Sequence, residues 1–162
     1  MTYSFKNWKK RYNYIASQVF KTMSLTIEIQ APAKEAFQKL HSSRTPFHTV
    51  ILKPNNQTQE VELVSEYPEG KKLDDIVSEI PSTEPRFIIH MPERVHADER
   101  KSYPIVMIAF CPKGLSPQAN IIYTNSRTQL VRDFQIPYTW DVKKKLEIGD
   151  EELMECFATN KW

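Results

Sequence analysis

The chain has 162 residues and a net charge of +2, and 26% of its residues are charged. This length fits one domain, and a domain of this size buries roughly 68–70% of the unfolded chain's surface without needing a disulfide or a metal. No apolar run approaches the ~20 residues of a membrane-spanning helix, so we expect no stable membrane insertion. Cys111 and Cys156 have no partner cysteine nearby in the sequence, so we expect free thiols.

The positive charge is concentrated at the N-terminus. Residues 1–22 hold five basic side chains and no acidic one, so they contribute +5 and the remaining residues −3. Three interpretations of this segment stay open: a disordered tail, a targeting or membrane-surface segment, and an upstream extension of the gene model. Because Met23-Ser24 would be a natural start, we predict a basic extension over residues 1–22 and one folded domain over residues 23–162. An acidic body does not indicate nucleic-acid binding, which usually needs a strongly basic face.

In the first half of the domain, helical and strand spacings of apolar residues alternate. Residues 33–41 follow a proline and predict a helix. Residues 48–54 form an apolar run and residues 60–67 alternate, so together they predict a hairpin. Residues 72–80 have apolar side chains at helical spacing, and Pro81 ends this short helix.

In the second half, residues 86–91 and 103–110 are nearly continuous apolar runs. Such runs are typical of strands whose two faces are both covered. Residues 93–101 join them as a long, charged hairpin tip, and loops on a rigid scaffold are common recognition sites. Residues 138–142 predict a last strand. Residues 150–157 predict a closing helix with an acidic first turn, which is favourable at the positive end of the helix dipole.

A long helix begins at Ser116 and Pro117, a suitable N-cap and first residue. At 100° per residue, its packing stripe contains Ala119, Tyr123, Ser126, Leu130 and Phe134. The branched apolar residues Ile121 and Val131 lie off this stripe. One interpretation is an imperfect amphipathic helix, and the other is a helix packed on its own sheet on one side and on a partner on the other.

This order of elements predicts an α/β fold of the α+β type, with a mixed sheet between helices. Signals for enzyme chemistry are weak. The three glycines are too widely separated for a phosphate-binding loop. The four histidines show no metal-ligand spacing, and His90 lies in an apolar strand, where a core histidine is the usual occupant. We therefore expect a protein that is not an enzyme and has no catalytic residue, metal or cofactor.

Short motifs in the second half of the chain are similar to one family. They are Ile80-Pro81, Pro85 to Ile88, Ser102 to Pro104, Ile122-Tyr123, Ser126-Arg127 and Leu130-Val131. On these residues the chain closely resembles glia maturation factor, a branch of the actin-depolymerising-factor homology (ADF-H) superfamily. The order of elements agrees over residues 24–162. The resemblance implies the ADF-H fold, a central mixed sheet of five or six strands with two helices on each side.

The resemblance also implies a function. Members of this branch bind the actin-related protein 2/3 (Arp2/3) complex, promote debranching of actin filament networks and inhibit new nucleation. It further implies a monomer in the cytoplasm, at actin-rich cortical structures and also in the nucleus, with at most weak binding to actin itself.

Two other functions stay open. The first is a cofilin-like module that binds and severs filaments directly, although the stretch after Ser126-Arg127 has much less positive charge than the lysine-rich helix of cofilin. The second is recruitment of the domain to acidic membranes by residues 1–22, since each basic residue near an anionic surface contributes about 1 kcal/mol.

Carried over position by position, the resemblance implies two binding surfaces. Surface one, which would lodge in the barbed-end groove of an actin-related subunit, consists of Ser24, Leu25, Ile121, Ser126, Arg127, Val131, Asp150 and Glu151. Surface two, at the charged hairpin tip, consists of Arg94, Asp98, Glu99 and Arg100. Ser24 is also a candidate phosphorylation site. The chain departs from the family pattern at Thr124 and Asn125, where two small residues are usual, and at Gln129 and Glu152.

Overall fold

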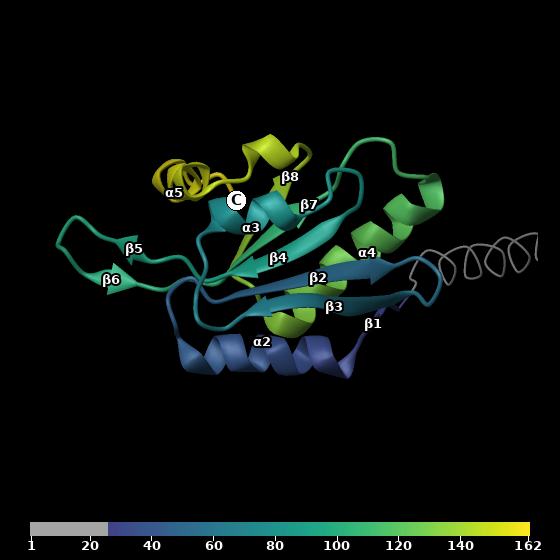
Figure 1. Cartoon of the computed structure of the whole chain (residues 1–162), viewed down its shortest axis with the longest axis horizontal. Coiled ribbons are helices and arrows are strands. Elements are labelled where there is room, and N and C mark those ends of the chain that lie inside the picture. Colours follow the sequence, from purple (N-terminus) through teal and green to yellow (C-terminus); the bar gives the residue numbers. More distant parts are fainter. Residues whose placement is uncertain (1–25) are drawn as a thin grey trace, which may run out of the picture.

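The computed structural model describes residues 26–162, which form a six-stranded sheet with helices on both faces (Figure 1). Ser24, Leu25 and the predicted boundary between residues 22 and 23 lie outside the described residues. Within the described range, none of the helices combines the length and the apolar character that crossing a membrane requires.

The sheet is mixed, and its strand order is β1-β3-β2-β4-β7-β8. The two outer pairs, β1 with β3 and β7 with β8, are parallel, and the three inner pairs are antiparallel. The strands are β1 (Glu28–Ile29), β2 (Thr49–Asn55), β3 (Glu60–Tyr67), β4 (Arg86–His90), β7 (Val106–Phe110) and β8 (Tyr138–Val142).

Two helices lie on each face of this sheet, as the family resemblance implied (Figure 1). One face carries α2 (Ala31–Ser43) and α4 (Pro117–Phe134), and the other carries α3 (Leu73–Glu79) and α5 (Asp150–Thr159). A short 3-10 helix, η1 (Lys145–Glu147), precedes α5. The strands β5 (Arg94–Val95) and β6 (Lys101–Ser102) form a separate hairpin that projects from the body.

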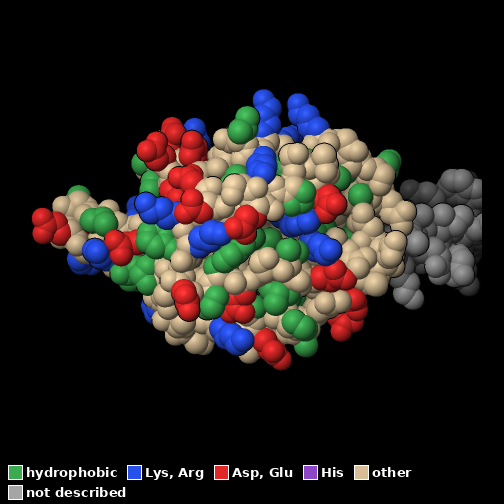
Figure 2. Space-filling model, viewed as in Figure 1, with side chains coloured by type: hydrophobic (Ala, Val, Ile, Leu, Met, Phe, Trp, Pro, Cys, Tyr) green, Lys and Arg blue, Asp and Glu red, His purple; other side chains and the backbone are tan. Residues whose placement is uncertain are grey.

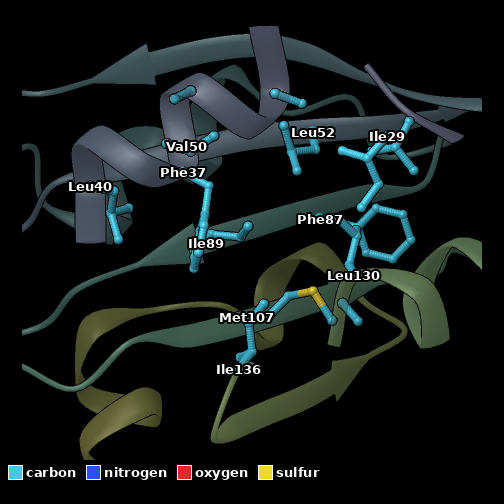
Figure 3. Packing of buried hydrophobic residues seen from close by; sticks show 14 of the residues in the cluster. Ile29, Phe37, Leu40, Val50, Leu52, Phe87, Ile89, Met107, Leu130 and Ile136 are labelled. Atoms are coloured by element: carbon cyan, nitrogen blue, oxygen red, sulfur yellow. The ribbon is translucent and has the colours of Figure 1, made fainter. Parts of the chain in front are cut away.

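The sheet separates two hydrophobic cores, one on each of its faces. On β4, Phe87 and Ile89 pack under α2 and α4, whereas Ile88 packs under α3 and α5. All three side chains are fully buried, which explains why this strand reads as a continuous apolar run. Figure 3 shows the first core, in which Phe37 of α2 and Leu130 of α4 approach the sheet from the helical layer.

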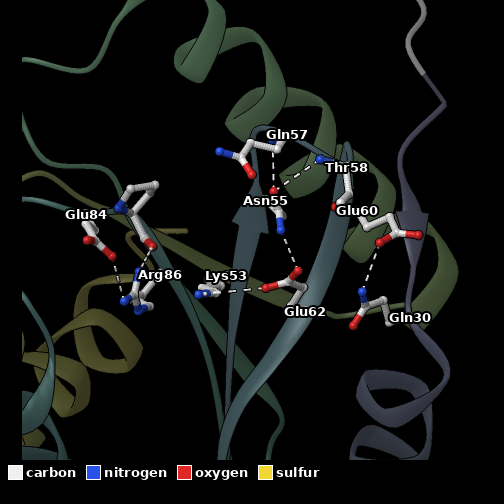
Figure 4. A network of polar contacts seen from close by, with 10 residues as sticks. Gln30, Lys53, Asn55, Gln57, Thr58, Glu60, Glu62, Glu84 and Arg86 are labelled. Carbon is white, nitrogen blue, oxygen red and sulfur yellow. Dashed lines mark hydrogen bonds and ion pairs between the residues drawn. The ribbon is translucent and has the colours of Figure 1, made fainter.

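The predicted hairpin of β2 and β3 is confirmed, and Asn55 organises its turn (Figure 4). The Asn55 side-chain oxygen accepts the backbone N–H groups of Gln57 at 2.8 Å and Thr58 at 3.2 Å. Its side-chain nitrogen donates to Glu62 at 2.5 Å. An asparagine that bonds to the backbone two residues ahead is a common turn former.

Several predicted boundaries differ from the structure by one or two residues, and larger differences occur at β7 and β1. The predicted strand over residues 103–110 starts only at Val106, because the preceding residues lead out of the β5–β6 hairpin. The strand β1 was not predicted, since it has only two residues and its partner β3 begins more than thirty positions later. A segment this short carries no periodicity that a sequence could reveal.

Candidate functional site

The helix α4 is the longest element near surface one, and its ends follow the predicted signals. The Ser116 hydroxyl accepts the N–H of Ala119 at 3.1 Å, and Pro117 occupies the first turn. Gln135 ends the helix in the left-handed conformation, with φ of 50°. The buried side chains are Ala119, Ile122, Tyr123, Ser126 and Leu130. Four of these belong to the predicted packing stripe, and Ile122 is the one that the prediction missed.

Aromatic side chains of the stripe attach α4 to the sheet and to α2. Tyr123 stacks on Phe87 of β4, with ring centroids 5.1 Å apart. Phe134, which is only partly buried, stacks on Phe37 of α2 at 4.0 Å. Burial also raises the pKa of Tyr123 well above its usual value, so its hydroxyl stays protonated. The α4 backbone is therefore held on the sheet along most of its length.

Ser126 does not lie on an exposed face, which corrects its assignment to surface one. Its side chain is 0% exposed, and its hydroxyl has no hydrogen-bond partner among the described residues. The physical reason is its position in the packing stripe, one turn after Ile122 and one turn before Leu130. A small side chain there lets the helix approach the sheet, so the role of Ser126 is packing.

The other α4 residues of surface one differ in accessibility. Ile121 is 50% exposed and is the only large apolar side chain of α4 that faces solvent to this degree. Val131 is partly buried and packs against the core beneath α4, so it is less available than predicted. Of the apolar residues assigned to surface one on α4, Ile121 is therefore the more exposed to solvent.

Arg127 forms a bidentate ion pair with Asp141 of β8. The Nε and Nη2 groups donate to the two carboxylate oxygens of Asp141, each at 2.7 Å. These hydrogen bonds raise the pKa of Arg127, which stays charged, and use two of its five N–H donors. No sequence signal pointed to Asp141, because the pair joins residues on different elements.

Asp150 caps a neighbouring helix. Its carboxylate accepts the backbone N–H groups of Leu73 at 3.3 Å and Asp74 at 3.2 Å, at the N-terminus of α3. In return, Asp74 accepts the N–H of Asp150 at 3.2 Å, so each aspartate satisfies the start of the other helix. Burial raises the pKa of Asp150. Asp150 is thus a structural residue as well as a candidate contact, whereas Glu151 is exposed.

Gly149 precedes α5 at this close approach of α3 and α5, in an extended conformation that any residue can adopt. A Cβ atom at Gly149 would lie 2.9 Å from the Asp74 carboxylate and would collide with the Glu152 carboxylate. Both carboxylates lie at the ends of side chains, so a substitution at Gly149 would require the Glu152 and Asp74 carboxylates to move.

Surface two lies at the tip of the β5–β6 hairpin, where Asp98, Glu99 and Arg100 are exposed. Asp98 accepts from Nε of Arg100 at 2.5 Å, and this hydrogen bond lowers the pKa of Asp98. Arg94 differs from the others, since its guanidinium lies over the Phe157 ring of α5 at 4.9 Å. Arg94 therefore attaches the hairpin to the body through a cation–π contact. Val95, which no sequence signal marked, is 60% exposed beside it.

A third exposed feature lies between the last strand and the last helix. Leu146 of η1 is 95% exposed and follows three lysines. Trp140, Leu146 and Cys156 contribute to the walls of a surface hollow of about 380 Å³ beside it. Figure 2 shows basic and acidic side chains mixed over the visible face, with acidic ones gathered around α5.

His90 and the two cysteines of the described residues belong to the packed interior or border it. His90 is fully buried, its Nδ1 lies 2.6 Å from the Thr49 hydroxyl, and desolvation lowers its pKa to about 4. It is therefore a neutral core histidine, as predicted. Cys111 and Cys156 are free, and burial raises the pKa of both thiols. Over residues 26–162, no three His, Cys, Asp or Glu side chains come together in a way that could hold a metal ion.

Comparison with known proteins agrees with this architecture. Residues 26–158 match the family of cofilin/tropomyosin-type actin-binding proteins. Glia maturation factor beta of Homo sapiens is 28% identical over 137 residues, which cover 82% of this chain and 96% of the relative. Glia maturation factor of Drosophila melanogaster is 20% identical over 126 residues, covering 78% and 91%.

Solved structures give the same result. The solution structure of glia maturation factor from Caenorhabditis elegans has a TM-score of 0.69 at 32% identity and covers 82% of this chain and 96% of its own. Cofilin of Streptomyces griseoflavus has a TM-score of 0.69 at 16% identity, covers 82% and 98%, and shows the fold alone. The predicted ADF-H fold is confirmed. The chain belongs to the cofilin/tropomyosin-type (ADF-H) family of actin-regulatory proteins, and its similarity to glia maturation factors places it on that branch.

Proposed function

We propose that this protein binds the Arp2/3 complex, promotes debranching of actin filament networks and inhibits nucleation by the complex. The observation that carries this proposal is the solvent-facing side of α4, where Ile121 is half exposed near a restrained Arg127. A barbed-end groove is apolar with a polar rim, and a branched aliphatic side chain with one arginine suits such a groove.

In this proposal, surface one contacts an actin-related subunit through Ile121, Arg127, Val131 and Glu151. Ser24 and Leu25 belong to the same surface by resemblance and lie outside the described residues. Asp150 supports the surface by joining the start of α5 to the start of α3. Surface two supplies a second contact through the exposed charges of the hairpin tip.

A cofilin-like function is the second candidate, because the family match includes cofilin and the fold agrees with a cofilin structure. The charge of α4 argues against it. After Arg127, the only basic residue of the helix is Arg132, and Arg132 lies 3.5 Å from the Asp133 carboxylate. Weak positive charge gives weak steering toward acidic filaments.

The full-length protein tests both candidates in two assays. Microscopy of pre-formed branched networks measures debranching, and co-sedimentation with unbranched filaments measures direct filament binding. We expect faster loss of branches and little sedimentation. Strong sedimentation without debranching would support the cofilin-like function instead. A fluorescent fusion would test the proposed location at cytoplasmic actin-rich cortical structures, with the nucleus as a second site.

A further inference from the structure

The outward face of α4 is more apolar in the structure than its sequence indicates. Ile121, Thr124 and Thr128 follow one another at spacings of three and four residues, so they lie along one stripe of the helix. All three are exposed, and the stripe lies opposite the buried one that contains Tyr123 and Leu130. From the sequence alone, two of the three residues count as polar.

The hydroxyl groups of both threonines are bonded to their own helix. Thr124 Oγ1 donates to the backbone oxygen of Asn120 at 2.8 Å, and Thr128 Oγ1 donates to that of Thr124 at 3.0 Å. A hydroxyl has a single O–H donor, so neither threonine keeps a donor for a partner. Each hydroxyl oxygen can still accept a hydrogen bond, and the methyl groups are the apolar parts of these two side chains that are available for contact.

This stripe is also free of charge along its first part. No charged residue occurs between Pro117 and Ser126, and the next residue, Arg127, is held by Asp141. Apolar contact is therefore possible from Ile121 through Thr124 to Thr128, with a neutralised cation at the side. Such a strip suits a groove that is apolar at its centre and polar at its rim.

We propose that Thr124 and Thr128 are contact residues of surface one that bind the actin-related partner through their methyl groups, in line with Ile121. This inference rests on the proposed function, and it names residues outside the set that the resemblance implied. It also explains how α4 tolerates Thr124 where small residues are usual, because a threonine with its donor engaged offers the partner a methyl group.

A matched pair of double variants of the full-length protein tests the inference. Thr124→Val with Thr128→Val keeps the shape and the methyl groups and removes the hydroxyls. Thr124→Ser with Thr128→Ser keeps the hydroxyls and removes the methyl groups. Binding of purified Arp2/3 complex is measured by titration, and thermal melts confirm that both variants fold.

We expect the valine variant to bind at least as tightly as the wild type. The serine variant should bind about fifteenfold more weakly, since it removes two methyl groups and each one removed from an apolar contact costs about fourfold in affinity. The reverse order would overturn the inference, because it would show that the hydroxyls contact the partner. Equal binding by all three proteins would also overturn it while leaving the proposed function intact. A wild type that does not bind the complex would overturn both.

Discussion

The two proposed binding surfaces are built in different ways. The helix α4 has 18 residues and is packed on the sheet by buried side chains along one stripe. The β5–β6 hairpin is paired through only two residue pairs, Arg94 with Ser102 and Val95 with Lys101, and is attached to α5 by Arg94. Surface one is therefore an apolar strip on a rigid element, whereas surface two is a charged tip on a narrow support.

This difference assigns different physical roles to the two surfaces. Apolar side chains that are held in place lose little conformational entropy on binding and dominate affinity. Exposed charges at a tip mostly change the rate of association and its dependence on salt. We therefore expect substitutions on α4 to change the affinity for the partner and substitutions at the tip to change the rate of association.

The largest effect is expected for Leu130→Ala, which tests the side of α4 that packs on the sheet and leaves its outer side unchanged. Leu130 is 0% exposed in the core under α4, so its truncation should lower the free energy of unfolding by about 2–5 kcal/mol. Chemical denaturation measures this change. A loss below about 1 kcal/mol would show that α4 is less firmly packed than the comparison requires.

The next effect concerns the outer side of the same helix. Ile121→Asp should leave the melting temperature nearly unchanged, because Ile121 is half exposed, and should weaken capture of the Arp2/3 complex about thirtyfold or more. Val64→Asp is the matched control, since Val64 is 42% exposed and lies on β3, which three strands of the sheet separate from β8. If both variants bound equally well, surface one would be misplaced.

A smaller effect is expected at the joint of α3 and α5. Asp150→Ala removes a carboxylate that caps α3, and loss of a helix cap typically costs about 1 kcal/mol of stability. Denaturation of the variant and the wild type at neutral pH measures this difference. An unchanged stability would mean that water satisfies these N–H groups equally well.

The same carboxyl predicts a pH dependence. Its pKa is raised by burial, so the folded state holds the proton more tightly than the unfolded chain does. The contribution of this group to stability is full below the unfolded pKa and declines as the pH rises through the folded pKa. Asp150→Asn should remove this component, and the difference between the two stability curves should therefore change over the acidic range. Parallel curves would contradict the raised pKa.

The sequence was sufficient to predict the longer helices and strands and insufficient to predict the contacts between them. The strands β3 and β8 have the predicted bounds, because alternation and turn residues are local signals. The pair of Arg127 with Asp141 and the mutual caps of Asp74 and Asp150 join residues on separate elements, and only the packed structure brings them together. Ser126 shows the same limit, since a resemblance marked its position and burial decides its role.

The smallest effect is expected at surface two, where Asp98→Ala with Arg100→Ala removes an exposed ion pair from the tip. Such pairs contribute little to stability, so the melting temperature should stay unchanged. The variant removes one acidic and one basic side chain and leaves the net charge of the tip unchanged, so association with the Arp2/3 complex at low salt should slow only slightly, and dissociation should change little. Stopped-flow measurements over a range of salt concentrations test this. A faster dissociation at an unchanged association rate would show that the tip makes a close contact with the complex. Both surfaces would then contribute to affinity, and the tip would not act on the association rate alone.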